Sequence, residues 1–259
     1  MHKGKTLSIG HRGASALRPE NTLESFKAAF DEHQCDMIEF DVHLSKDLIP
    51  IVFHDETLER TTDGKGFVAH QSLQELKSLD AGFNFDPESN GTFPFRGKGI
   101  KIPTLEEVFE LFPEKKLAIE IKSVCAQTVD RILKIISKHN AFSRVVVGSL
   151  YDPIYQELKQ KQNNFKIFSS KREAIRLYLQ YRLGINKKLP CPDLVASLPV
   201  ESKFIDLKKE AWIKWLQNKG ITVYYWTVND PQLMKILSAR GADGLMSDNP
   251  GIIQAAIAT

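Results

Sequence analysis

The sequence predicts an α/β protein of the (β/α)8 TIM-barrel class with a small insertion after the second strand. Over the 259 residues, short apolar, β-branched segments alternate with amphipathic helical segments. Near-continuous apolar strands are typical of a parallel sheet that is buried on both faces. About 250 residues is also the usual length of eight β–α units. A doubly wound open sheet is the alternative, but its first strand is normally followed by a glycine-rich turn, which this sequence does not have.

The predicted strands and helices follow one another in barrel order. The strands are Leu7–Gly10, Met37–Val42, Leu117–Lys122, Val145–Ser149, Lys166–Phe168, Leu194–Ser197, Thr222–Trp226 and Gly244–Ser247. The helices predicted between them include Thr22–His33, Ala126–His139, Tyr151–Gln162, Leu207–Asn218 and Pro231–Arg240. We therefore expect residues 1–259 to form a single barrel domain.

The segment Pro50–His54 is an additional apolar strand that does not fit the β–α alternation. Only a few residues separate it from Val42, whereas a parallel crossover needs a dozen or more. The connection must therefore be a hairpin with its turn near Ser45–Leu48. Such a turn places residue 54 opposite residue 39, so His54 should return to the same end of the barrel as Glu39.

Residues 56–102 are expected to form an inserted subdomain at the end of the barrel where loops carry function. The segment is rich in Gly, Asn, Asp, Pro and Phe, and it contains one short helical piece at Ser72–Leu79. Its phenylalanines are Phe67, Phe83, Phe85, Phe93 and Phe95. We expect these side chains to pack within the insertion in preference to contacting a substrate.

Charge, cysteines and hydropathy restrict the classes of protein. The net charge of +3 is too small for a nucleic-acid partner. The cysteines, Cys35, Cys125 and Cys191, form no CxxC pair, so we expect reduced structural thiols. The segment Met1–Ile9 does not resemble a signal peptide, and no apolar run approaches the roughly 18 residues of a membrane span. We expect a soluble, cytoplasmic protein without stable membrane insertion, either a monomer or a homodimer.

Carboxylates occur inside two of the predicted strands. Glu39 and Asp41 are two positions apart and therefore share one face, and Glu120 shares a face with Lys122 on the next strand. Three clustered carboxylates repel one another unless a cation neutralises them, and an all-oxygen site selects Mg²⁺ or Ca²⁺. Alternatively, these charged residues could lie on strand edges that are exposed to solvent. The apolar residues on both sides of them make this alternative less favourable. Lys122 would be a counter-ion or a phosphate contact.

Two histidines and an arginine are expected at the same mouth. His11 ends the first strand and is followed by Arg12, whose guanidinium suits two-point binding of a phosphate. His54 returns there through the hairpin. One base, one acid and a cation are a suitable set for cleaving a phosphodiester. His43 lies further out on the hairpin, where we expect a structural role.

Short motifs in these regions resemble those of the glycerophosphodiester phosphodiesterase family. In the first quarter of the chain they are His11-Arg12-Gly13, Pro19-Glu20-Asn21-Thr22, Glu39-Phe40-Asp41 and His54-Asp55. Later matches are Thr61-Thr62-Asp63-Gly64, Leu79-Asp80-Ala81-Gly82, Ile102-Pro103-Thr104-Leu105-Glu106-Glu107, Glu120-Ile121-Lys122, Trp226-Thr227-Val228-Asn229 and Asp248-Asn249-Pro250. Each motif is weak alone, but together they span nearly the whole chain in the order of the family.

The resemblance implies metal-dependent hydrolysis of glycerophosphodiesters to glycerol 3-phosphate and an alcohol, in lipid and glycerol metabolism. It implies that Glu39, Asp41 and Glu120 hold a divalent cation, Mg²⁺ or Ca²⁺. It also implies that His11 and His54 are the general acid and base, in an order that the sequence does not give. The small-molecule substrate would be the only partner implied.

The remaining site residues implied by the resemblance bind the substrate. Arg12 and Lys122 would bind the phosphate, Trp226 would line the pocket, and Glu20 would border the active site. Two of the motifs have a structural alternative, since Asn21 could cap the first helix with Glu24, and Asp248 could cap the last helix. Trp226 could instead fill the barrel core.

Three other functions are compatible with these residues. A related phosphodiesterase could act on lysophospholipids, and it would need an apolar groove, for which the phenylalanine-rich insertion is a candidate. A barrel aldolase or isomerase could use Lys122 as a Schiff-base amine. A non-catalytic phosphate-binding protein is the third, although such a protein has no need of both histidines.

Overall fold

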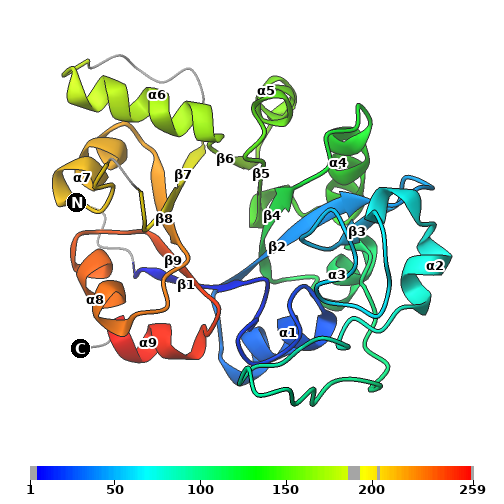
Figure 1. The fold of residues 1–259 in the computed structure, drawn as a ribbon. Helices are drawn as coiled ribbons and strands as arrows, with labels where there is room; N and C mark the ends of the chain where they lie inside the picture. Colours follow the sequence, from blue (N-terminus) through cyan, green and yellow to red (C-terminus); the bar gives the residue numbers. More distant parts are fainter. Residues whose placement is uncertain (1–4, 186–192, 203–204, 258–259) are drawn as a thin grey trace.

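Eight parallel strands form a closed barrel with helices outside it in the computed structural model, which describes residues 5–185, 193–202 and 205–257 (Figure 1). Hydrogen-bonded neighbours follow the order β1-β9-β8-β7-β6-β5-β4-β2, and the pairing of β1 with β2 closes the ring. The predicted (β/α)8 class is therefore confirmed. The ninth strand, β3, pairs antiparallel with β2 outside the ring.

The elements have the following bounds. The strands are β1 (Leu7–His11), β2 (Met37–Leu44), β3 (Pro50–Val52), β4 (Lys116–Ile121), β5 (Val145–Gly148), β6 (Lys166–Phe168), β7 (Leu194–Pro199), β8 (Thr222–Trp226) and β9 (Gly244–Ser247). The helices are α1 (Leu23–Lys27), α2 (Leu73–Ser78), α3 (Leu105–Leu111), α4 (Thr128–Lys138), α5 (Asp152–Lys161), α6 (Lys171–Arg182), α7 (Glu210–Asn218), α8 (Pro231–Ala239) and α9 (Gly251–Ile257). Each predicted strand is present, with ends that differ by at most two residues.

The predicted helix Thr22–His33 is divided into α1 and a π-helical turn, Ala28–Glu32. The cap of α1 also differs from the prediction. Thr22, not Asn21, is the N-cap residue, and its side chain accepts a hydrogen bond from the backbone N–H of Ser25. Asn21 is therefore not required for the helix start and points elsewhere.

The barrel interior is filled by one apolar side chain from each of its eight strands. These side chains are Ile9, Met37, Ala118, Val146, Phe168, Val195, Tyr224 and Met246. Alternate residues of the same strands, such as Ile38, Phe40 and Ile119, belong to the larger core between the barrel and the helices. The interior is thus a packed layer, and open space begins only above it.

The hairpin of β2 and β3 is present, but its register differs by one residue from the predicted one. Val42 lies opposite Val52, and the backbone N–H of Phe53 donates to the carbonyl of Asp41 at 3.0 Å. His54 therefore lies opposite Phe40, not residue 39. The register differs because the turn is one residue longer than predicted. A hydrogen bond from the N–H of Ser45 to the carbonyl of Ile49 closes this turn.

β2 exchanges its neighbour halfway along its length. Its first residues, as far as Glu39, pair with β1, whereas its last residues, from Val42, pair with β3 on the same side. The other side of β2 pairs with β4. The last residue of β1 and the segment that follows β3 therefore approach the same stretch of β2.

The segment of residues 56–102 has its own small apolar core, which is mainly aliphatic. Leu58, Val68, Leu76 and Ile100 are buried there. α2 begins with a capping box, in which Ser72 and Glu75 each accept a hydrogen bond from the backbone N–H of the other. The segment therefore packs on β3 through aliphatic side chains, and the start of its helix α2 is stabilised by local hydrogen bonds.

The phenylalanines of this segment contact one another or a cation. Phe85 and Phe95 form an edge-on pair at 5.5 Å, and the guanidinium of Arg96 lies over Phe83 and Phe93. These contacts confirm the expected packing of those four rings. Phe67 is half-exposed, and its ring lies 5.3 Å from that of His70 at a tilt of 57°.

The described part of the chain contains no helix that is both long and apolar enough to cross a membrane. Among the described residues, Cys35 is a buried free thiol and Cys125 is an exposed one. The prediction for Cys191 falls outside the described residues.

Candidate active site

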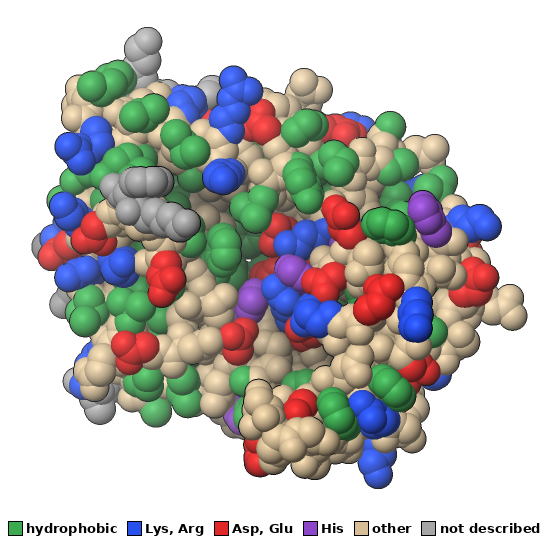
Figure 2. Space-filling model, viewed as in Figure 1, with side chains coloured by type: hydrophobic (Ala, Val, Ile, Leu, Met, Phe, Trp, Pro, Cys, Tyr) green, Lys and Arg blue, Asp and Glu red, His purple; other side chains and the backbone are tan. Residues whose placement is uncertain are grey.

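Strand alternation places the predicted site residues directly above the packed barrel interior. His11, Glu39 and Glu120 each follow, by two positions, a side chain that fills this interior, and Asp41 follows one by four. They therefore point to the barrel axis at the carboxyl ends of β1, β2 and β4. Figure 2 shows that positive, negative and histidine side chains meet at the centre of this face.

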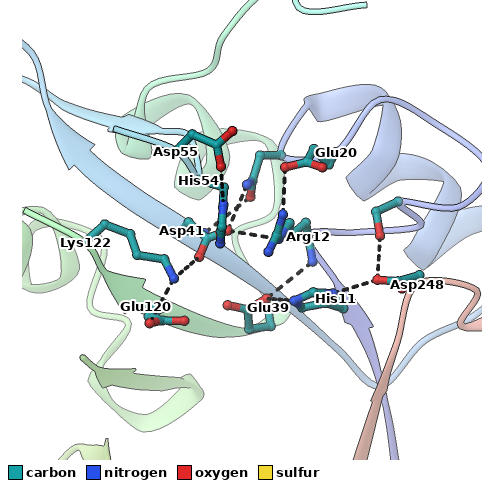
Figure 3. Close-up of polar contacts among 12 residues, drawn as sticks. His11, Arg12, Glu20, Glu39, Asp41, His54, Asp55, Glu120, Lys122 and Asp248 are labelled. Atoms are coloured by element: carbon teal, nitrogen blue, oxygen red, sulfur yellow. Dashed lines mark hydrogen bonds and ion pairs between the residues drawn. The ribbon is translucent and has the colours of Figure 1, made fainter. Parts of the chain in front are cut away.

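These side chains surround a cavity of about 170 Å³. The predicted site residues that line it are His11, Arg12, Glu39, His54, Glu120, Lys122 and Trp226. Asp41 is buried next to these residues and does not itself line the cavity, and Glu20 lines an adjoining open recess next to His11 and Arg12. The structure thus brings all nine predicted residues to one end of the barrel, and Figure 3 labels all of them except Trp226.

The three carboxylates form a group that could hold a metal ion. One oxygen from each of Glu39, Asp41 and Glu120 lies within 4.8 Å of the others. Two oxygens on one Ca²⁺, each at about 2.4 Å, can be up to about 4.8 Å apart, so the spacing fits a hard divalent ion. Asp41 and Glu120 are direct neighbours in the β2–β4 register, which explains their closeness.

Burial and mutual repulsion disfavour ionisation in this group. Burial and the adjacent Asp41 raise the pKa of Glu39 to about 8. Burial also raises the pKa of Glu120, although Lys122 opposes this effect. Burial would raise the pKa of Asp41 as well, but Lys122 and Arg12 outweigh it and hold this pKa below its usual value. A bound cation would favour the ionised forms of Glu39 and Glu120, whose pKa values are raised.

Lys122 and Arg12 are the two cations that contact the group. The ammonium of Lys122 lies 3.0 Å from Glu120 and 3.2 Å from Asp41. The guanidinium of Arg12 lies 2.9 Å from Glu20 and 3.4 Å from Asp41. Burial lowers the pKa of Lys122, but Asp41 and Glu120 raise it by more. A Schiff-base lysine needs a lowered pKa, so this environment opposes the aldolase alternative.

The loop after β1 is held by two residues in the left-handed region. Arg12 has φ 54° and Asn21 has φ 56°. The N–H of Asn21 donates to the carbonyl of Arg12, and its side-chain amide donates to Asp41 at 2.9 Å. Asn21 therefore connects the loop that carries Arg12 to the carboxylate group. Of the two roles considered for this residue, helix cap or active-site neighbour, the structure supports the second.

His11 is oriented by a residue from the other end of the chain. Its Nδ1 lies 2.6 Å from Asp248, which follows β9 and also accepts hydrogen bonds from Ser15 and Asn229. Burial favours the neutral form of Asp248, but the bond to His11 outweighs it and lowers the pKa of this carboxyl to about 2. A carboxylate only accepts, so Nδ1 is the donor, and Nε2 lies toward Glu39 at 4.0 Å.

His54 has a carboxylate partner of its own. Its Nδ1 lies 2.6 Å from Asp55, and Arg60 contacts Asp55 at 2.5 Å and Glu20 at 2.7 Å. Burial favours the neutral form of Asp55, but Arg60 and His54 outweigh it and lower the pKa to about 2. The buried His43 donates from Nε2 to the backbone carbonyl of His54 at 3.0 Å, which supports the structural role expected for it.

Trp226 lies between the charged cavity and a second, apolar cavity of about 560 Å³. This apolar cavity lies beside α6 and is lined by side chains that include Leu150, Ile175, Tyr178, Leu198 and Leu207. Leu150, Ser169 and Ser197 also line both spaces. From the sequence, the insertion is only a candidate for the apolar groove of the lysophospholipid alternative; this cavity lies elsewhere, and the described rings of the insertion contact one another or Arg96.

Sequence reasoning missed the roles of Asp55, Arg60 and Asp248. Asp55 had a local signal, because it directly follows His54 in a family motif. The sequence suggests a helix cap for Asp248, but its side chain is hydrogen-bonded to His11. Arg60 had no such signal, because its partner Glu20 is 40 residues away in the chain.

Comparisons with known proteins agree on one family. The sequence profile of the "Glycerophosphoryl diester phosphodiesterase family" matches residues 11–252. A glycerophosphodiester phosphodiesterase of Caldanaerobacter subterraneus is 34% identical over 251 residues, covering 95% of each chain. Human lysophospholipase D is 26% identical, and the match covers 93% of this chain and 83% of that protein.

Solved structures of similar fold carry related names. An Oleispira antarctica phosphodiesterase, solved in complex with the product sn-glycerol-3-phosphate, is 28% identical with a TM-score of 0.74, covering 97% of this chain and 96% of that one. A glycerophosphoryl diester phosphodiesterase domain from Mycobacterium tuberculosis has a TM-score of 0.85 at 21% identity, covering 98% of each chain. Because the identity to the Mycobacterium tuberculosis domain is only 21%, this similarity supports the fold and nothing further.

Proposed function

The chain belongs to the glycerophosphoryl diester phosphodiesterase family, and from this premise we propose that it hydrolyses glycerophosphodiesters to glycerol 3-phosphate and an alcohol. The observation that carries the proposal is the pairing of two histidines with separate carboxylates around one cavity, beside three clustered acids. A phosphodiester hydrolase needs a base, an acid and positive charge at one place. The product complex of the Oleispira antarctica relative is consistent with the proposed product.

Glu39, Asp41 and Glu120 are the residues proposed to hold a divalent cation, Mg²⁺ or Ca²⁺. Their oxygen donors, their spacing and the raised pKa values of Glu39 and Glu120 support this assignment. When bound, such an ion would act as a Lewis acid on the phosphodiester oxygens.

Arg12 and Lys122 are proposed to bind the phosphate oxygens from the two sides of the carboxylate group. Both side chains line the cavity and are largely buried, so their charge acts in a region with little water. Each already contacts Asp41, which limits their movement before substrate arrives.

The two histidines are proposed to transfer the protons. One accepts the proton of the attacking hydroxyl as its oxygen bonds to phosphorus, and the other donates a proton to the alcohol oxygen as the P–O bond breaks. The family resemblance indicates a neighbouring glycerol hydroxyl as nucleophile, with water then opening the cyclic phosphate. Asp248 and Asp55 hold the Nδ1 protons of His11 and His54, so Nε2 is the nitrogen available in each ring.

The test of this proposal is a coupled assay of glycerol 3-phosphate release from several glycerophosphodiesters. We expect turnover that EDTA abolishes and that Mg²⁺ or Ca²⁺ restores, with the better ion identified by the add-back. Release that is indifferent to EDTA would contradict the proposed cation. No release from any glycerophosphodiester would contradict the substrate class.

Lysophospholipids are the second candidate substrates, and the apolar cavity behind Trp226 is the observation that favours them. Its volume of about 560 Å³ and its largely apolar lining suit part of an acyl chain, and it lies beside the cavity that holds the histidines. The human relative named as a lysophospholipase D is in agreement with this candidate.

A side chain that fills the apolar cavity separates the two substrates. Ala174→Phe places a ring in this cavity, and Ala174 does not line the cavity that holds the charged catalytic residues. If lysophospholipids are substrates, the variant should lose their turnover while it keeps that of glycerophosphocholine. Equal effects on both, or no wild-type turnover of lysophospholipids, would exclude this candidate.

We further propose that residues 1–259 act as one domain whose insertion, at about residues 56–102, borders the site, in the cytoplasm and as a monomer or homodimer. Arg60 of this segment contacts the acidic partners of the site, which supports a functional role for the insertion. The free thiols of Cys35 and Cys125 suit a reducing compartment. Cell fractionation and sedimentation velocity would test the location and the oligomeric state.

A further inference from the structure

The outer face of α6 carries an apolar stripe that is open to solvent. Ile175, Leu179 and Leu183 are spaced by four residues and therefore share one face of the helix. Their exposed fractions are 48%, 54% and 70%. The opposite face is used for the fold, since Leu177 is fully buried and Tyr178 packs on Trp212. The stripe is thus not part of the core that attaches α6 to the barrel.

Other exposed apolar side chains gather at the same end of the barrel. Val124 follows β4, and Leu150 and Tyr151 follow β5, with exposed fractions of 59%, 41% and 42%. Together with the stripe they account for six of the nine large apolar side chains that are exposed in the described residues. Figure 2 shows hydrophobic side chains along the upper part of this face, where Figure 1 places α5 and α6.

The stripe is flanked by positive charge. α6 carries Lys171, Arg172, Arg176 and Arg182, and its one acidic residue is Glu173. Glu173 is buried and paired with Arg176, so it does not offset the other three at the surface. The side chain of Arg172 is 84% exposed and lies 3.7 Å from Asp152 of α5, which offsets part of its charge, whereas Lys171 and Arg182 have no ion pair within the described residues. A helix with apolar residues between exposed basic ones is the pattern of helices that lie in a lipid–water interface.

The stripe is continuous with the apolar cavity beside the active site. Ile175 belongs to both, and the cavity reaches from it to Trp226 at the catalytic pocket. If α6 lies on a lipid surface, the apolar cavity would therefore connect that surface to the pocket that contains the histidines.

We propose that the exposed face of α6, with the adjacent loops after β4 and β5, docks on an anionic lipid surface. The apolar side chains enter the boundary between head groups and acyl chains, and the basic side chains contact anionic head groups. This is reversible attachment to a surface and involves no membrane span. It does not depend on the proposed substrate, because attachment can be measured without turnover.

The experiment is co-sedimentation of the full chain with vesicles of phosphatidylcholine containing about one third phosphatidylglycerol. We expect the wild type to sediment with these vesicles and to be released by high salt, as screening weakens the contribution of the basic residues. The double variant Leu179→Ser/Leu183→Ser should bind at least about tenfold more weakly, since it removes two apolar side chains from the interface. Arg172→Gln/Arg182→Gln should lose the preference for anionic vesicles.

Ile236→Ser is the matched control, because Ile236 is 44% exposed but lies on α8, away from the proposed face. This variant should bind as the wild type does, and thermal unfolding should show that all variants are folded. The proposal is overturned if the wild type does not bind anionic vesicles, or if the stripe and control variants bind equally. It is also overturned if sedimentation velocity shows a wild-type dimer that the stripe variant converts to monomer, since a second copy would then cover the stripe.

Discussion

At the residue scale, each proposed catalytic histidine is held by a carboxylate with a strongly lowered pKa. The two Nδ1–carboxylate distances are the same, 2.6 Å, but the partners differ in origin. Asp55 is the sequence neighbour of His54, whereas Asp248 is 237 residues from His11. Only the first pairing could be anticipated from adjacency in the sequence.

Replacement of either histidine should remove most turnover and leave the fold intact. His11→Ala and His54→Ala are each expected to lower kcat by about 10² to 10⁴, the usual contribution of a general acid or base. Circular dichroism and calorimetric titration with Ca²⁺ should remain close to the wild type. Near-wild-type turnover in either variant would refute the paired acid–base mechanism.

Asp248→Asn tests the role of this carboxylate as a positioning residue. An amide no longer dictates which nitrogen of His11 carries the proton, so kcat should fall by about 10² or more with little change in KM. Asn249→Ala, at the next position, is the control. A change confined to KM would indicate a substrate contact and not a positioning role.

The same variant should alter acid stability. The pKa of Asp248 is lowered from 3.8 to about 2 by folding, so its contribution to stability is complete above about pH 4 and is lost as pH falls toward 2. Urea unfolding of the wild type between pH 5 and pH 2 should therefore decline more steeply than that of Asp248→Asn. Parallel declines would show that the carboxylate does not stabilise the folded state.

At the element scale, the strands could be predicted well and the hairpin less well. Alternation and apolar content identify a strand, because they reflect burial directly. The turn between β2 and β3 depends instead on Leu48, which adopts φ 61°, and on the side chain of Ser45, which bonds to Ile49. The sequence does not indicate that a leucine will adopt the left-handed conformation, which is rare for residues other than glycine. The predicted turn is therefore one residue shorter than the observed one, and the predicted strand register differs by one.

The insertion should influence catalysis through a single side chain. Arg60→Ala removes the contacts to Asp55 and Glu20, and kcat is expected to fall by about tenfold as the support of His54 weakens. Arg60→Lys should recover part of the loss. Arg96→Ala is the matched control, because Arg96 stacks on rings of the same insertion and has no contact with the site. Equal activities of the two alanine variants would exclude this link.

At the scale of the whole molecule, the carboxylate group places catalysis and stability in opposition. Glu39 is fully buried, and its pKa is raised to about 8 without a cation. For a raised carboxyl pKa, the unfolded chain ionises first, so the metal-free protein should lose stability as pH rises from about 4.5 to about 8. The barrel core must offset this penalty, because the carboxylates are needed at its mouth.

Divalent ions should therefore stabilise the protein by binding only the folded state. Mg²⁺ or Ca²⁺ at about 100 times its Kd should add about 2.7 kcal/mol and raise Tm by several degrees. Glu39→Gln should be at least as stable as the wild type in EDTA but should show little shift on ion addition. A shift as large as that of the wild type would remove Glu39 from the proposed ligands.

The bond between His11 and Asp248 also bears on how the protein is made. His11 lies on the first barrel strand, and Asp248 directly follows the last. During synthesis on the ribosome, the residue that orients His11 emerges only after every other barrel strand. A nascent chain that stops before β9 can contain both histidines and the three carboxylates proposed to bind the cation, and still lack an oriented pair. Activity is therefore expected only from chains that extend past Asp248, so that products ending before this residue are inert.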